Sequence, residues 1–138
     1  MKWTILVVVI LVSIFIACLC YRIREDFKQE SNDPMLLRVK EKLKYMYPEL
    51  HKLEFYESNK SYTTNKQKVH LCLKDKNGSY YSENMLTYVA LHELAHVMCD
   101  EVGHTHKFYA IFQQLLDKAH SIGIYDPSIP IVRDYCEH

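Results

Sequence analysis

The segment 88-YVALHELAHVM-98 is an apolar run interrupted by two histidines and a glutamate. Ten of the fourteen residues from 85 to 98 are apolar, so a helix here is apolar nearly all round and is expected to be buried. A buried ionisable group is costly unless it is paired, neutralised or bound to a metal. Because a helix turns once every 3.6 residues, His92 and His96 share one face, with Glu93 beside them.

The pattern His-Glu-x-x-His on a helix predicts a zinc site. Imidazoles four residues apart can reach one ion at about 2 Å, and a catalytic zinc usually has three protein ligands and one open position. The intervening Glu93 contacts the zinc-bound water instead, which makes it the candidate catalytic base. The third ligand is open among His104, His106 and Asp100, since Gly103 can reverse the chain and Asp100 continues the polar face.

Length and composition predict one globular domain. The chain has 138 residues, of which 49% are hydrophobic and 25% charged, and this mixture supports a packed core. Seventeen basic residues balance seventeen acidic ones, so no nucleic-acid partner is expected.

The N-terminal stretch 3-WTILVVVILVSIFIACLCY-21 carries no charge and predicts a transmembrane helix. Trp3 and Tyr21 stand where interfacial aromatic residues sit. A cleaved signal peptide and a lipoprotein signal are the alternatives, but the run is longer than a typical signal core and lacks a good cleavage site. We therefore predict a membrane anchor at 1–22, a polar tether at 23–32 and the folded domain at 33–138.

Flanking charges predict the side of the membrane. Arg22, Arg24 and Lys28 follow the span, whereas Lys2 precedes it, so the domain is expected on the cytosolic side of a host or virion membrane. Two of the five cysteines lie within the span, and the remaining three do not suggest a disulfide framework. A bridge between Cys72 and Cys136 stays open for an oxidising compartment.

The rest of the chain predicts one helix, two strands and two further helices, in this order. A first helix is expected from Pro34, capped by Asp33, up to Pro48. Strands are expected at 52–57 and 68–74, where apolar and polar residues alternate. The motif helix should run over 83–100 with Ser82 as its cap, and a last helix should run from Thr105 to Gly123.

The segment 92-HELAHVMCDEVGHTHKF-108 resembles the WLM and SprT-like group of minimal zinc metallopeptidases, and most closely the small versions encoded by large DNA viruses. In that group the third ligand begins a His-x-x-x-Phe pattern, so the resemblance selects His104. It also implies an α+β zincin-like domain, in which a small antiparallel-type sheet packs on the active-site helix. Its edge strand, expected at 68–74, would hold an extended peptide by strand addition.

These observations predict a membrane-anchored zinc metallopeptidase. The metal ligands are His92, His96 and His104, the cofactor is Zn²⁺, and Glu93 activates the water. The partners are a protein or peptide substrate and, through residues 3–21, the membrane. Either Tyr125 or Tyr135 is a candidate donor to the oxyanion, although packing is the simpler role for both. The alternative is a membrane-anchored structural or interaction protein with a non-catalytic zinc site.

Overall fold

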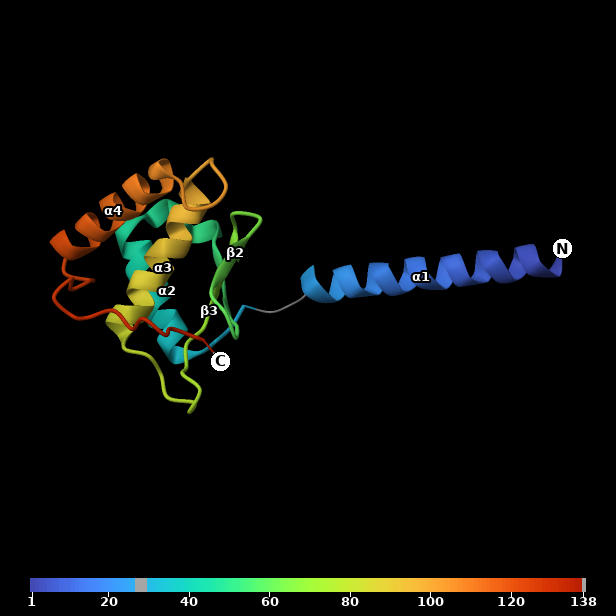
Figure 1. The fold of residues 1–138 in the computed structure, drawn as a ribbon, viewed down its shortest axis with the longest axis horizontal. Coiled ribbons are helices and arrows are strands. Elements are labelled where there is room, and N and C mark those ends of the chain that lie inside the picture. The colour runs from blue at the N-terminus through green and yellow to red at the C-terminus, as the bar shows by residue number, and fades with distance from the viewer. Residues whose placement is uncertain (27–29, 138) are drawn as a thin grey trace.

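The computed structural model describes residues 1–26 and 30–137, which form a long N-terminal helix and a mixed α+β domain (Figure 1). This confirms the predicted fold class. In chain order the elements are α1 (Lys2–Asp26), α2 (Pro34–Met46), the 3-10 helix η1 (Pro48–Lys52), β1 (Glu54–Glu57), β2 (Tyr62–Thr64), β3 (Lys68–Leu71), α3 (Glu83–Met98) and α4 (His106–Ser121).

Helix α1 extends away from the domain in Figure 1, and its apolar side chains are exposed along its length. The segment Lys2–Arg24 is long and apolar enough to cross a membrane by length and composition, a test that a signal sequence also passes. The helix continues to Asp26, four residues into the stretch expected to be a polar tether. The backbone N–H of Ser31 donates to the carbonyl of Phe55, which joins the chain after α1 to the sheet.

The sheet has the strand order β1-β3-β2 and is mixed. β1 pairs parallel with β3, with Phe55 opposite Val69, whereas β2 pairs antiparallel with β3. The expected antiparallel-type sheet is therefore corrected to a mixed one, and the strand expected at the edge, 68–74, is the central strand. The physical reason is burial on both faces: Val69 and Leu71 pack into the core, while His70 stacks between the rings of Tyr56 and Tyr62 on the other face.

Helix α3 lies at the centre of the domain and contacts α2, α4, β3 and β2. Its apolar residues Ala90, Leu91 and Leu94 have no exposed surface, which confirms that the motif helix is buried. The predicted helix starts are also confirmed. The Asp33 carboxylate accepts the N–H groups of the first turn of α2, Ser82 caps α3 and Thr105 caps α4.

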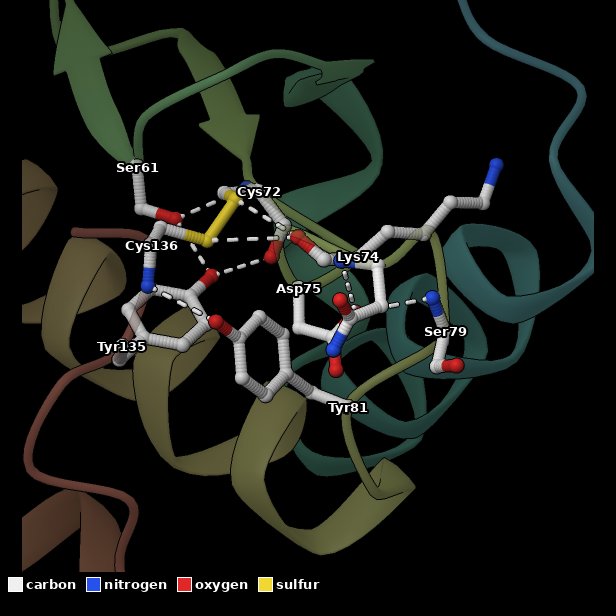
Figure 2. The surroundings of a disulfide bond; sticks show 9 residues. Ser61, Cys72, Lys74, Asp75, Ser79, Tyr81, Tyr135 and Cys136 are labelled. Atoms are coloured by element: carbon white, nitrogen blue, oxygen red, sulfur yellow. Dashed lines mark hydrogen bonds between the residues drawn. A yellow bond between two sulfur atoms is a disulfide. The ribbon is translucent and has the colours of Figure 1, made fainter. Parts of the chain in front are cut away.

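A disulfide joins Cys72, just after β3, to Cys136 in the C-terminal tail (Figure 2). The odd number of cysteines outside the span does not suggest a disulfide framework, but the structure contains the bridge that the sequence allows in an oxidising compartment. A third cysteine of the domain, Cys99, is buried and free. The bridge closes a loop that contains the whole of α3 and α4, and it fixes the tail against the sheet.

Candidate metal centre

Three imidazoles converge at the C-terminal half of α3. His92 and His96 lie one turn apart on the helix, and the Nε2 atom of His104 is 3.1 Å from the Nε2 atom of each. The three ligand atoms all lie within 4.8 Å of one another. Nitrogens bound to a tetrahedral zinc at 2.0–2.1 Å are separated by about 3.4 Å, so this spacing is close to that of a zinc site.

The protonation of these rings also fits a cation. Burial, followed by the neighbouring His96 and His104, lowers the pKa of His92 to about 4, and burial lowers the pKa of His96. The two rings are therefore neutral at pH 7, which is the form that binds metals. A single ring nitrogen can donate or accept one hydrogen bond, so Nε2 of His104 cannot satisfy both neighbours by hydrogen bonding. A shared cation gives each nitrogen a partner.

The loop between α3 and α4 positions the third imidazole. Gly103 has φ +84°, a left-handed conformation that favours glycine, and it turns the chain so that His104 returns to the helix. Across the base of this loop the Lys107 ammonium lies 2.6 Å from the Asp100 carboxylate. Asp100 is thus engaged by Lys107, and among the described residues the three-imidazole group does not include His106, an exposed residue at the start of α4.

Two phenylalanine rings pack against the imidazoles of His92 and His96. Phe108 is fully buried, and its ring centroid lies 4.9 Å from that of His92 and 4.3 Å from that of His96. Phe112 packs edge-on against His92 at 5.2 Å. The phenylalanine of the His-x-x-x-Phe pattern therefore orients the two helix imidazoles by packing, a role that the spacing alone did not indicate.

Glu93 lies beside the imidazoles with 5% of its surface exposed. The hydroxyl of Thr63 donates to its Oε2 at 2.8 Å and approaches its backbone carbonyl at 3.3 Å. Burial raises the pKa of the Glu93 carboxyl, and the bond from Thr63 opposes this rise. Thr63 was not predictable from the sequence, because β2 has only three residues and lacks the apolar alternation that marks a strand.

The two tyrosines singled out in the sequence have different surroundings. Tyr125 is buried and packs against Tyr88, with their ring centroids 6.0 Å apart. Tyr135 borders a cleft together with Glu93, and its hydroxyl donates to the carbonyl oxygen of Cys72. Burial is the main cause that raises the pKa of Tyr135 to about 12, so its hydroxyl keeps its proton.

Two clefts meet at the imidazoles, and both are bordered by Ser61, His92 and Glu93. The first, of about 700 Å³, extends between the N-terminal half of α3 and the C-terminal tail. The second, of about 480 Å³, extends between β2 and the loop that carries His104. The two clefts thus flank the candidate metal centre and share Ser61, His92 and Glu93 on their borders.

Two solved structures share the fold of the domain. The chain matches two crystal structures of Wss1 from Saccharomyces cerevisiae. One, of a mutant, has a TM-score of 0.57 and 19% identity over 72% of this chain and 91% of that chain. The other has a TM-score of 0.58 and 20% identity, over 70% and 85%. The domain therefore has a WLM-like fold, as the resemblance of its motif implied.

Sequence relatives come from viruses. The chain is 51% identical over 87 residues to the uncharacterized protein 136R of Invertebrate iridescent virus 6, covering 61% of this chain and 49% of that protein. It is 49% identical over 85 residues to the uncharacterized protein 042R of Invertebrate iridescent virus 3, covering 61% and 54%. The chain thus spans about half the length of these curated relatives. No protein-family model matches it.

Proposed function

We propose that this protein is a zinc-dependent peptidase of the small viral WLM type. His92, His96 and His104 would hold the zinc, and Glu93 is the general base. The observation that carries the proposal is a buried carboxylate next to three converging imidazoles, all bordering one cleft. A site that served only to stabilise the fold would need no carboxylate beside its open position.

The chemistry divides between the metal and the side chains. Zinc, when bound, lowers the pKa of a water molecule toward ~7 and polarises the carbonyl of the peptide bond. Glu93 takes the proton of the attacking water and delivers it to the leaving amine nitrogen. Thr63 holds the Glu93 carboxylate by one oxygen, which leaves the other oxygen for this proton transfer.

The substrate we propose is an extended protein or peptide segment. β2 is one of the two edge strands of the sheet, and it lies against α3 through the Thr63–Glu93 bond. A segment that adds to this edge would run through the cleft past Glu93, with main-chain hydrogen bonds supplying affinity. The balanced charge of the chain gives no electrostatic reason for a nucleic-acid substrate.

Removal of the metal tests this function. The full chain, purified in detergent and loaded with zinc, should hydrolyse unfolded protein substrates. A chelator should abolish hydrolysis, and added zinc should restore it. The helical circular dichroism at 25 °C should persist without metal, because the core and the disulfide do not depend on the imidazoles. Loss of the helical signal on chelation would instead indicate the non-catalytic, fold-stabilising site.

We further propose that α1 anchors the enzyme in a membrane. The flanking charges favour the cytosolic side by a small margin, whereas a disulfide persists on surfaces that face an oxidising environment, virion surfaces included. Because the Cys72–Cys136 bridge is formed, we propose that the domain lies on the oxidising side of the membrane. After thiol blocking in intact cells or virions, the membrane fraction extracted at high pH should retain the protein, and mass spectrometry should find residues 72 and 136 joined. Free thiols at both positions would support the cytosolic side.

A further inference from the structure

The C-terminal tail is fixed next to the candidate metal centre by a closed set of bonds around Cys72 (Figure 2). The disulfide holds Cys136, and the Tyr135 hydroxyl donates to the carbonyl of Cys72. The Ser61 hydroxyl lies 2.8 Å from the Tyr135 hydroxyl and accepts the backbone N–H of Cys72 at 3.0 Å. The end of the tail is thereby tied to both the sheet and the residue that precedes β2.

The tail is also attached to the start of α3. The backbone N–H of Cys136 donates to the Tyr81 hydroxyl at 2.9 Å, and the rings of Tyr81 and Tyr135 lie 4.8 Å apart. At the other end of the tail, the Asn84 side chain exchanges two hydrogen bonds with the backbone of Asp126, at 2.8 and 3.0 Å. Residues 127–134 are therefore held at both ends as they pass the N-terminal half of α3 (Figure 1).

This arrangement leaves a cleft of about 700 Å³ beside Glu93, here called the apolar cleft because most of its walls are apolar; Lys60 and Glu137 also border it. Met85, Tyr88 and Val89 of α3 line one wall, and Ile131 and Val132 of the tail line the other. Ile131 is 40% exposed and Val132 is 44% exposed, so these two residues present apolar surface to the cleft rather than fill the core. Such a surface gains free energy when an apolar group of a ligand covers it.

The direction of β2 indicates which substrate residue binds in the apolar cleft: the one before or the one after the cleaved bond. Lys60 borders only the apolar cleft, Ser61 borders both clefts, and Lys66 borders only the other one. Antiparallel pairing is slightly more stable per residue than parallel pairing. A substrate that runs antiparallel to β2 therefore enters at Lys66, passes Glu93 and leaves by Lys60. The apolar cleft then receives the residue that follows the cleaved bond.

We propose that the disulfide-tied tail forms one wall of a specificity pocket, which binds a large apolar side chain on the carboxyl side of the cleaved bond. This inference rests on the proposed peptidase function. Hydrophobic pockets discriminate by about 10- to 200-fold per methylene. An apolar residue at this position should therefore be preferred over a charged one by at least about tenfold in kcat/KM.

The zinc-loaded full chain in detergent should be given a peptide mixture, and its cleavage sites mapped by mass spectrometry. Leucine, isoleucine, methionine and phenylalanine should predominate directly after the cleaved bond. Val132→Asp replaces apolar surface of the pocket wall by a carboxylate, in addition to that of Glu137 at its border, so it should lower this preference about tenfold and increase cleavage before lysine and arginine. Ile129→Asp is the matched control, because Ile129 is an equally exposed tail residue that does not line the cleft, and its preference should equal that of the parent.

A double variant, Cys72→Ser with Cys136→Ser, releases the tail and tests its role as a wall. We expect continued hydrolysis with the apolar preference reduced. If this variant does not fold, the Val132→Asp comparison still decides the proposal. Hydrolysis by the parent without an apolar preference, or with one that Val132→Asp leaves intact, overturns the pocket alone. Absence of hydrolysis by the parent overturns the peptidase function and the pocket with it.

Discussion

Replacing Glu93 by glutamine should reduce peptide hydrolysis by about 100- to 10,000-fold, the range that a general base contributes. Glutamine has the same shape and can still accept the hydroxyl of Thr63 through its amide oxygen, so the surroundings of the side chain are kept. It cannot take a proton from water. Zinc content should remain that of the parent, because Glu93 does not belong to the group of three imidazoles that would bind the metal. The measurements are the initial rate on an unfolded protein and the zinc content by elemental analysis.

Glu41→Gln is the matched control for this variant. Glu41 is exposed on α2 and borders neither of the two clefts beside the imidazoles, so its variant should hydrolyse at the parental rate. If Glu93→Gln retains the parental rate, Glu93 is not the general base. If it loses zinc as well as activity, the carboxylate takes part in binding the metal.

Replacing His104 by alanine should weaken zinc binding by more than the 10- to 100-fold loss that is typical when an outer partner of a metal ligand is removed. The variant keeps two imidazoles on α3, and two nitrogens leave the zinc without its third protein ligand. Hydrolysis should fall with zinc occupancy. The affinity can be measured by competition with a chromogenic zinc chelator at pH 7.

His106→Ala is the control, since the same residue type is removed two positions away. His106 is exposed at the first position of α4, so its loss should leave zinc affinity unchanged. An equal loss of zinc affinity in His104→Ala and His106→Ala would show that zinc binding depends on the conformation of the loop rather than on one imidazole. The reverse order of losses would make His106 the third ligand.

The helices were predictable from the sequence because their signals are local. Asp33 before Pro34, Ser82 and Thr105 each supply a side-chain oxygen to the first turn of a helix, and the structure has all three caps. The placement of His92, Glu93 and His96 on one buried helix follows from the helical repeat in the same way.

The sheet and the cleft were not predictable to the same degree, because they depend on contacts between distant segments. The parallel pairing of β1 with β3 leaves β2 at the edge, and nothing within residues 62–64 marks that position. The bond from Thr63 to Glu93 spans 30 residues, and the bridge from Cys72 to Cys136 spans 64. The choice of His104 over His106 depended on resemblance, since either imidazole lies within reach of a chain reversal at Gly103.

The short connection between α1 and the domain limits which proteins the domain can reach. Five residue steps separate Asp26, at the end of α1, from Ser31, whose backbone is bonded to β1. A fully extended chain covers about 18 Å in five steps. Once α1 is inserted in a bilayer, the domain is confined to a thin layer above the lipid headgroups. Proteins embedded in the same bilayer then meet it by lateral diffusion at a high local concentration, whereas freely diffusing proteins gain no such advantage.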